Sequence, residues 1–302
     1  MTMLIIRKLK SKFLYTKCTY KETIVIMNQL IDEKLDKLKK IISSYGSVVI
    51  AFSGGVDSTL LARVAKDSCP DIKLVTVSFS AIPEFEIAES IELAETLGLK
   101  HEIMKLNELK IPGFSENGLE RCYHCKKYLF STLKKYALDN KFDVVLDGTN
   151  ADDTNDYRPG RKALKELGIV SPLKNVDLSK KEIRAISRQY GLSTESKPSY
   201  ACLASRFPYG ERLTEAKLKR VGFAEEDIRK LGFTQLRVRS HENLARVEFI
   251  PEEISNAWEK RKQIEEKCKQ RGFDYVTLDT SGYRTGAMNE TLSESELNKF
   301  SD

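Results

Sequence analysis

Short apolar runs alternate with amphipathic stretches along the first half of the chain. The runs are rich in β-branched residues and short enough for buried strands, which are predicted at residues 48–52, 73–77, 100–106 and 143–146. Apolar residues recur at helical spacing around them, which predicts helices at residues 30–43, 57–65, 84–97 and 123–138. This alternation predicts an α/β fold with a doubly wound parallel sheet, whose ligands bind beyond the carboxyl ends of the strands.

The second half begins with a helix and then changes character. Ser179 is the predicted N-cap of a helix at 179–190, and Glu182 three residues later completes a capping box. An irregular stretch follows at 192–210, and long ordered loops of this kind are often functional. Beyond it the pattern predicts a small α+β domain, with helices at 213–231 and 251–271 and strands at 235–239, 245–249 and 275–278.

Positive charge is concentrated at the N-terminus. The 302-residue chain has a formal net charge of +6, and six basic residues precede the first acid, Glu22. The 50 basic residues less these six leave 44, which balance the 44 acidic residues, so we expect no nucleic-acid partner. Met27 opens the first helical pattern, which predicts that Met27 is the natural start and that residues 1–26 are a poorly ordered extension.

The composition is that of a globular protein, with 41% hydrophobic and 31% charged residues. No apolar run approaches the roughly 18 residues that a membrane helix needs. The basic N-terminal segment also lacks the apolar core of a signal peptide. We therefore expect a cytoplasmic protein with no membrane partner, built from an α/β domain at 27–205 and an α+β domain at 206–302.

The segment SGGVDS, residues 53–58, lies between the first strand and the following helix. Gly54 and Gly55 allow the backbone to approach a phosphate closely, and the helix start supplies unpaired N–H donors. Ser53 and Ser58 add hydroxyl donors, while Asp57 either caps the helix or helps to hold the magnesium ion of a nucleotide. The alternative is a structural glycine turn. The motif is similar to the loop of the PP-loop ATP pyrophosphatases, which implies ATP and Mg²⁺ as cofactors.

A second polar segment, DGTNADD at residues 147–153, follows the fourth strand. The carboxyl ends of parallel strands share one edge of the sheet, so we expect this segment near the phosphate loop. Gly148 permits a tight turn, and Thr149 and Asp152 are candidates for contacts with ATP or Mg²⁺. The alternative is a solvated acidic turn that caps the next helix.

The six cysteines include one closely spaced pair, Cys122 and Cys125. A cytosolic protein of this size does not need disulfides, so a CxxC pair indicates metal or redox chemistry. The spacing of the other four shows no organisation: Cys18, Cys69, Cys202 and Cys268.

Several segments together resemble the LarE family of sulfur transferases. They are RCYHCK from Arg121, GTNADDTNDYRPG from Gly148, KPSYACLASR from Lys197, RVRSH from Arg237, ARVE from Ala245 and GYRTG from Gly282. The resemblance implies an enzyme that uses ATP to adenylate a carboxylate of pyridinium-3,5-biscarboxylic acid mononucleotide, releases pyrophosphate and then replaces AMP with sulfur. The thiocarboxylic acid formed belongs to the synthesis of the nickel-pincer nucleotide cofactor of lactate racemase.

The resemblance also implies a site for this anionic substrate. Two carboxylates and a phosphate need cationic partners, and the planar fork of arginine suits both groups. The candidates inside or beside the matching motifs are Lys126, Ser205, Arg206, Arg237, Arg239, Arg246 and Arg284. For each arginine the alternative is a surface salt bridge. We expect the C-terminal domain to bind the substrate or to form a homo-oligomer.

The LarE family obtains its sulfur in two ways. In one branch the cysteine at the position of Cys202 gives up its own sulfur and becomes dehydroalanine. In another branch that cysteine joins a CxxC pair to hold a [4Fe-4S] cluster, with one iron left open for a sulfide, and Cys122 and Cys125 match that pair. The alternatives are a zinc site completed by His124 and a thiol redox pair. The resemblance favours the cluster, with all three cysteines as catalytic residues.

Two other functions share part of these motifs. A tRNA-thiolating enzyme has the same phosphate loop and often three cysteines, but the neutral body argues against an RNA surface. The other is a nucleotide-binding scaffold without catalysis, which release of pyrophosphate from ATP would exclude.

Overall fold

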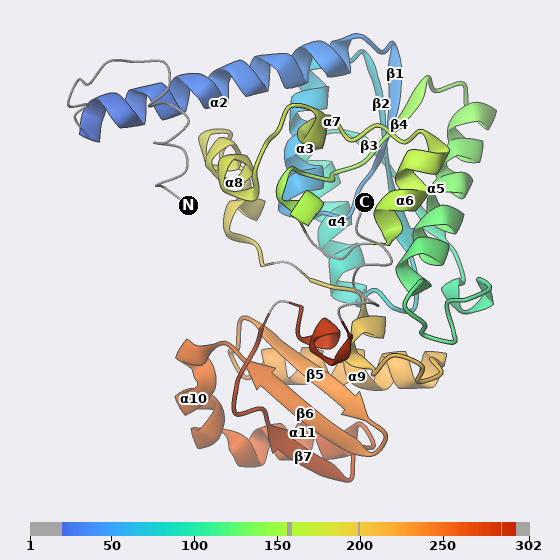
Figure 1. Ribbon diagram of the computed structural model, residues 1–302, viewed down its shortest axis with the longest axis vertical. Coiled ribbons are helices and arrows are strands. Elements are labelled where there is room, and N and C mark those ends of the chain that lie inside the picture. Colours follow the sequence, from blue (N-terminus) through green and yellow to red (C-terminus); the bar gives the residue numbers. More distant parts are fainter. Residues whose placement is uncertain (1–19, 156–158, 199, 285, 294–302) are drawn as a thin grey trace.

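The computed structural model describes residues 20–155, 159–198, 200–284 and 286–293 (Figure 1). The α/β part contains α2 (Tyr20–Ser43), β1 (Ser47–Ala51), α3 (Val56–Ser68), β2 (Asp71–Ser78), α4 (Glu84–Leu97), β3 (Lys100–Lys105), η1 (Glu108–Lys110), α5 (Arg121–Asp139), β4 (Val144–Leu146), η2 (Asp152–Asn155), α6 (Gly160–Leu167), α7 (Pro172–Asn175), α8 (Lys180–Gln189), η3 (Ser193–Ser196) and η4 (Leu203–Arg206). The C-terminal part contains α9 (Glu215–Arg229), β5 (Leu236–His241), β6 (Leu244–Phe249), η5 (Pro251–Glu253), α10 (Ile254–Glu259), α11 (Arg261–Gln270), β7 (Tyr275–Leu278) and η6 (Ala287–Thr291).

The four strands of the first part form a parallel sheet in the order β3-β2-β1-β4. The predicted α/β fold with a parallel sheet is therefore confirmed. Side chains of β1 alternate between the two faces, as the period of a strand requires. Val48 and Ile50 join the core beneath α2, α3 and α8, whereas Val49 joins the core beneath α5 and α6. Both faces are covered by helices (Figure 1), which explains the continuous apolar runs in the sequence.

Local signals set several helix ends. The predicted capping box of α8 is confirmed, because Ser179 Oγ accepts from the backbone N–H of Glu182 and the Glu182 carboxylate accepts from Ser179. Helix α2 begins at Tyr20, seven residues before Met27. Residues 1–19 of the predicted extension lie outside the described residues, and the division of the chain into domains stays a prediction. No helix in the described ranges is long and apolar enough to cross a membrane.

The predicted α+β character of the C-terminal part is confirmed, and the structure shows that its three strands form a mixed sheet. Strand β5 pairs antiparallel with β6, and β6 pairs parallel with β7. The predicted continuous helix at 251–271 is wrong, because the chain divides there into η5, α10 and α11. The break falls at Lys260, which leaves helical geometry (φ −87°, ψ 10°) while its ammonium group donates to the carbonyl of Leu231 at 2.7 Å.

The irregular stretch predicted at 192–210 connects the two parts. The backbone N–H of Leu203 donates to the carbonyl of Ala81 at 2.9 Å, behind the end of β2. Phe207 and Leu203 share one apolar core with Phe114 of the first part and with the helices and strands of the second. This stretch therefore fixes the small domain against the carboxyl edge of the parallel sheet, where ligands of such folds bind.

Candidate functional site

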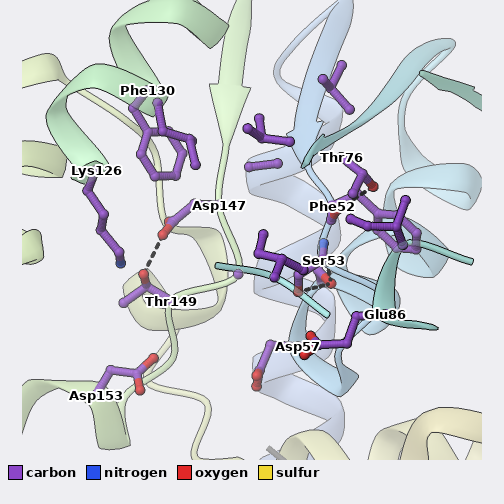
Figure 2. A pocket seen from close by; sticks show the side chains of 18 of the residues that line it. Phe52, Ser53, Asp57, Thr76, Glu86, Lys126, Phe130, Asp147, Thr149 and Asp153 are labelled. Atoms are coloured by element: carbon purple, nitrogen blue, oxygen red, sulfur yellow. Dashed lines mark hydrogen bonds between the residues drawn. The ribbon is translucent and has the colours of Figure 1, made fainter. Parts of the chain in front are cut away.

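A cavity of about 330 Å³ opens at the carboxyl ends of β1, β2 and β4 (Figure 2). Five of the eight residues predicted to bind ATP and Mg²⁺ line it: Ser53, Asp57, Ser58, Gly148 and Thr149. Apolar side chains, among them Phe52 and Phe130, cover another part of the wall. An apolar wall beside convergent polar groups is typical of a small-molecule site and suits a purine next to phosphates.

The phosphate loop is held by its own hydroxyls. Ser53 Oγ and Ser58 Oγ lie 3.1 Å apart, and the backbone N–H of Gly55 donates to Ser53 Oγ at 3.3 Å. Gly54 has a positive φ of 65°, and a Cβ there would lie 3.2 Å from the Cα of Ser90 in α4. Only glycine takes this conformation without strain. The loop therefore leads directly into the N-terminus of α3, whose free N–H groups favour an anion.

Asp57 faces a cation as well as the cavity. Its carboxylate pairs with Lys180 Nζ at 2.5 Å and accepts from Asn150 Nδ2 at 3.1 Å. A Cβ on Gly148 would lie 3.2 Å from the backbone nitrogen of Ser58, so the segment after β4 packs closely on the start of α3. This confirms that the two predicted motifs meet at one edge of the sheet.

The three acidic residues after β4 have different surroundings and different contacts. Asp147 is buried, and its carboxylate accepts from the hydroxyls of Thr149 and Ser171. Asp152 is exposed and accepts from the backbone N–H of Lys180 at 2.7 Å, so it caps α8, the alternative raised from the sequence. Asp153, rather than Asp152, lines the cavity. Residues 156–158 of this motif lie outside the described residues.

Two residues of the cavity region were missed by the sequence analysis. Glu86, in the first turn of α4, lines the cavity, and burial raises the pKa of its carboxyl to about 7 against the opposing charges of Lys197 and Arg206. Lys197 donates to the carbonyl of Gly54 at 2.8 Å and pairs with Glu89 at 2.7 Å. Lys197 therefore ties the irregular stretch to the phosphate loop. The sequence offered one signal for Glu86, its place in the first turn of the helix that follows the carboxyl end of β2.

Helix α5 links the cavity to the cysteines. Lys126 and Phe130 project from α5 on the side of the cavity opposite Ser53 and Asp57 (Figure 2). Cys122 and Cys125 lie in the first turns of the same helix, where Cys122 is exposed and Cys125 half-buried. Because residues three and four apart share one side of a helix, the thiols and Lys126 are carried on neighbouring faces.

The third cysteine joins this pair. Cys202 is exposed, immediately precedes η4, and interacts electrostatically with the thiols of Cys122 and Cys125. The Cys202 residue is exposed overall, but surrounding protein desolvates its thiol, and desolvation raises the pKa of both Cys202 and Cys125. The neighbouring thiols raise both pKa values further, and the guanidinium of Arg121 opposes these shifts. Cys202 and a thiol pair that lies about eighty positions earlier in the sequence are therefore gathered beside one buried arginine.

The arrangement of Cys122, Cys125 and Cys202 bears on the two kinds of metal site that the sequence suggested, a zinc ion and an iron–sulfur cluster. Within the described ranges no three His, Cys, Asp or Glu side chains are arranged to hold a single metal ion, so a preformed zinc site with His124 is absent there. A four-iron cluster is much larger than one ion and takes thiolate ligands that lie farther apart. Cys122, Cys125 and Cys202 supply the three thiols that a cluster with one open iron would take. Cys69 and Cys268 are buried in the cores, and Cys18 lies outside the described residues.

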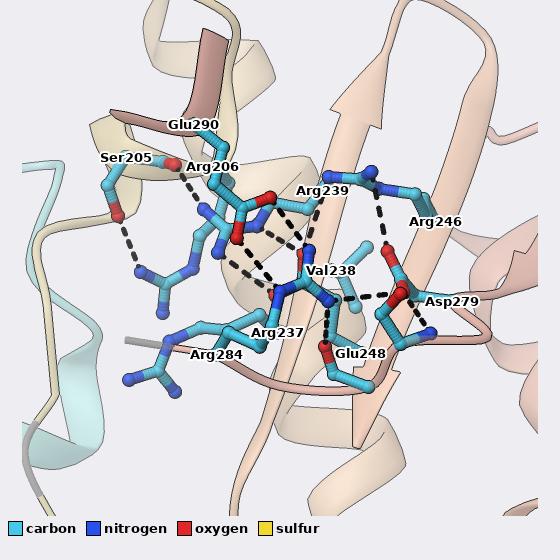
Figure 3. A network of polar contacts seen from close by, with 12 residues as sticks. Ser205, Arg206, Arg237, Val238, Arg239, Arg246, Glu248, Asp279, Arg284 and Glu290 are labelled. Carbon is cyan, nitrogen blue, oxygen red and sulfur yellow. Dashed lines mark hydrogen bonds and ion pairs between the residues drawn. The ribbon is translucent and has the colours of Figure 1, made fainter. Parts of the chain in front are cut away.

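The predicted substrate-binding arginines gather at the same junction (Figure 3). Arg237 and Arg239 alternate with apolar residues along β5, so both guanidinium groups leave the face of the sheet opposite to its core. Arg239 pairs with both oxygens of Glu248 at 2.9 Å and also donates to the carbonyl of Ser205 at 2.7 Å. The arginine face of the small sheet therefore meets the loop that carries Cys202.

Carboxylates accompany most of these arginines. Arg246 lies 3.4 Å from Glu248 and 3.3 Å from Asp279, and Arg284 forms a two-bond pair with Glu290 at 2.8 and 2.9 Å. An incoming anion would compete with these carboxylates or use the remaining N–H donors. Arg246 and Arg284 therefore form salt bridges in the structure, which was the alternative role considered for each arginine.

Arg206 is placed differently from the other candidates. Its side chain is 1% exposed and forms a two-bond pair with buried Glu225 at 2.7 and 3.0 Å. The same guanidinium donates to the carbonyl of Ala201 at 2.9 Å and to Ser205 Oγ at 2.9 Å. Arg206 therefore holds the loop of Cys202 in place through hydrogen bonds on both sides of that residue. Its contact with substrate stays a prediction.

A strand, an SGGVDS loop and a helix at the carboxyl edge of a 3-2-1-4 parallel sheet define the chain as an enzyme of the PP-loop ATP pyrophosphatase superfamily, which implies the use of ATP. Pyridinium-3,5-bisthiocarboxylic acid mononucleotide synthase of Lactiplantibacillus plantarum is 36% identical over 255 residues, which cover 84% of this chain and 92% of that protein. The chain therefore belongs to the LarE family.

Other relatives agree with this placement. The uncharacterized protein slr1717 of Synechocystis sp. is 42% identical over 269 residues, covering 88% of this chain and 100% of that protein. The NH(3)-dependent NAD(+) synthetase of Archaeoglobus fulgidus is 26% identical over 189 residues, covering 57% of this chain and 72% of that protein. A model for a family of unknown function (DUF7411) matches residues 47–155, which hold the phosphate loop and the thiol pair.

Proposed function

We propose that this chain is an ATP-dependent sulfur transferase that converts a carboxylate of pyridinium-3,5-biscarboxylic acid mononucleotide into a thiocarboxylic acid. The observation that carries the proposal is that one helix, α5, contributes side chains both to the cavity and to the group of cysteines. Its Lys126 lines the cavity beside the phosphate loop, while its Cys122 and Cys125 meet Cys202 one turn away. Activation of a carboxylate and delivery of sulfur therefore have adjacent places in the molecule.

In the first step a substrate carboxylate oxygen attacks the α-phosphorus of ATP, and pyrophosphate leaves. The loop of Ser53 to Ser58 would hold the pyrophosphate through backbone N–H groups and hydroxyls. Mg²⁺ is usually held by one or two carboxylates together with the phosphates, and Asp57 and Asp153 offer such oxygens at the cavity. The product is an acyl adenylate, whose carbon is now open to a sulfur nucleophile.

In the second step sulfur attacks the acyl carbon and AMP leaves. Cys122, Cys125 and Cys202 would hold a [4Fe-4S] cluster, which supplies an iron without a protein ligand and a renewable source of sulfide when bound. The apolar surroundings of Cys125 limit access of water to this side of the group. Lys126 would contact the phosphate of the substrate or of ATP from the same helix.

A single-use variant of the same reaction needs only one cysteine. Cys202 Sγ would attack the acyl carbon, and AMP would leave. Loss of the Cys202 α-proton and cleavage of its Cβ–Sγ bond would then release the thiocarboxylate and leave dehydroalanine. The exposed position of Cys202 permits either route, so the experiment below separates them.

The arginine face of the small domain is the proposed place for the substrate anions. Arg239 on β5 donates to the carbonyl of Ser205 in the Cys202 loop, and Arg237, Arg246 and Arg284 lie beside it (Figure 3). Ser205 contributes a hydroxyl, which already accepts from Arg206. Forked guanidinium groups bind carboxylate and phosphate with two hydrogen bonds each, which suits a substrate with both groups.

The test begins with protein purified without oxygen and reconstituted with iron and sulfide. We expect about four irons per chain, lost in Cys122→Ala and retained in the matched control Cys69→Ala. The Cys69 thiol lies at the opposite edge of the sheet, beside the carbonyl of Asp71 where β2 begins. Cys202→Ala should abolish sulfur transfer while pyrophosphate release from ATP and substrate continues. Protein without iron whose Cys202 loses 34 mass units during turnover, about the mass of hydrogen sulfide, would establish the single-use route. Substrate-independent binding of ATP without pyrophosphate release would refute the proposed function.

A further inference from the structure

The guanidinium group of Arg121 is buried without a carboxylate partner. Arg121 is 5% exposed, and among the described residues it forms no ion pair with an acidic side chain. Two other buried arginines of this junction, Arg206 and Arg239, each face a glutamate. A buried cation without a charged partner is unfavourable, so Arg121 would stabilise a group beside it that becomes anionic.

The acceptors around Arg121 include a cysteine sulfur. The guanidinium donates to Cys122 Sγ at 3.6 Å, to the carbonyl of Ala204 at 3.1 Å and to Asn117 Oδ1. The thiols of Cys122 and Cys202 also interact electrostatically with this guanidinium. One side chain thus contacts the first turn of α5 and the segment after Cys202, and it directs its charge towards the sulfur atoms.

Asn117 extends this contact into a clamp. It is fully buried with a positive φ of 52°, and its amide donates to the carbonyl of Pro208 at 2.7 Å while its Oδ1 accepts from Arg121. The backbone N–H of Gly210 also donates to the carbonyl of Asn117 at 3.0 Å. The Cys202 segment is therefore held at both ends, by Arg121 at Ala204 and by Asn117 at Pro208.

We propose that Arg121 is the positioning residue of the sulfur centre, where it holds the start of α5 against the Cys202 segment and offsets the negative charge of the sulfur atoms. The inference rests on the proposed function, because that function is what makes these sulfurs anionic during delivery. A guanidinium is suited to this place, since it always carries its charge and contacts several acceptors at once. A lysine would keep the charge and lose the fork.

The test compares full-length Arg121→Met and Arg121→Lys with the control Arg220→Met. The control substitution also removes a guanidinium group, but Arg220 contacts Ser240, Glu242 and Phe273, which all lie in the C-terminal part. Two properties are measured: the yield of a short bis-maleimide cross-link between Cys202 and Cys122 in metal-free protein, and the iron bound after reconstitution. We expect Arg121→Met to lose cross-link and to weaken iron binding about tenfold or more, with partial recovery of iron in Arg121→Lys.

Pyrophosphate release from ATP and substrate reports whether each variant is folded. An Arg121→Met protein with the cross-link yield and iron content of the parent would overturn the inference. If that variant does not fold, Asn117→Ala decides the question, because it keeps the charge and removes the clamp: a reduced cross-link supports the inference and an unchanged one overturns it. If the parent protein binds no iron, the cluster proposal fails, and the cross-link in metal-free protein still tests Arg121.

Discussion

Glu86 provides a test of how far water is excluded from the cavity beside the phosphate loop. Its carboxyl lies in the first turn of α4 and lines the cavity, and burial is the largest cause that raises its pKa from 4.5 to about 7. Burial disfavours the charged form, while the cations Lys197 and Arg206 favour it without reversing the shift. Glu86→Gln replaces this carboxyl with a neutral group of the same shape.

The sign of the effect follows from the raised pKa. A folded-state pKa of about 7 against 4.5 in the unfolded chain means that stability is full below pH 4.5 and is lost as pH rises through 7. The whole shift corresponds to about 3 kcal/mol at high pH. Because Glu86 is half-buried, solvent screening reduces the expected gain of Glu86→Gln at pH 8.5 to about 1–2 kcal/mol. At pH 4.5 the variant and the parent should be equally stable.

Urea unfolding at pH 5, 7 and 8.5 measures this difference, since the contributions of all other titrating groups cancel between variant and parent. The matched control is Glu92→Gln, an exposed position of the same helix with the same change of charge. We expect the control to stay within about 0.5 kcal/mol of the parent at each pH. A free-energy difference for Glu86→Gln that does not grow between pH 5 and 8.5 would refute the reasoning, because it would mean that water reaches this carboxyl freely.

Further predictions concern the cavity and the buried pairs. ATP affinity of the parent should fall above pH 7, because ionised Glu86 repels the phosphates, and calorimetry of Glu86→Gln should show a flatter profile. Gly148→Ala places a Cβ 3.2 Å from the start of α3 and should weaken ATP binding about tenfold in the same assay. Glu225→Gln leaves its arginine partner buried and unpaired, so the free energy of unfolding should fall by about 3–5 kcal/mol. Gly282→Ala brings a Cβ to 2.7 Å from a carbonyl oxygen and should destabilise the small domain more than Gly210→Ala, where φ is also positive but the space is open; equal losses would contradict this.

Much of the α/β domain could be predicted from local patterns. The run Val48-Val49-Ile50 is apolar throughout because β1 is central and covered on both faces, and the glycines after it mark the turn into α3. Given parallel strands, the meeting of residues 53–58 with residues 147–153 follows from topology alone. The alternation of Arg237 and Arg239 with apolar residues accounts for the charged face of β5.

Other features depended on contacts between distant segments. The separation of Asp152, which caps α8, from Asp153, which faces the cavity, is decided by the turn after β4 and not by residue type. The raised pKa of Glu86 requires the neighbours that bury it. The pairing of Arg206 with Glu225 is equally invisible in the sequence, because α9 brings that carboxylate from nineteen positions away.

The sequence by itself determined which chemistry is available: a phosphate loop, three cysteines and a set of arginines in recognisable motifs. Only the tertiary structure decided that Cys202 returns to the first turn of α5 and that Arg121 lies beneath both. The reason is physical. Periodicity and turn chemistry act over a few residues, whereas the course of the irregular stretch is set by long-range hydrogen bonds and burial, such as those of Asn117 and Phe207.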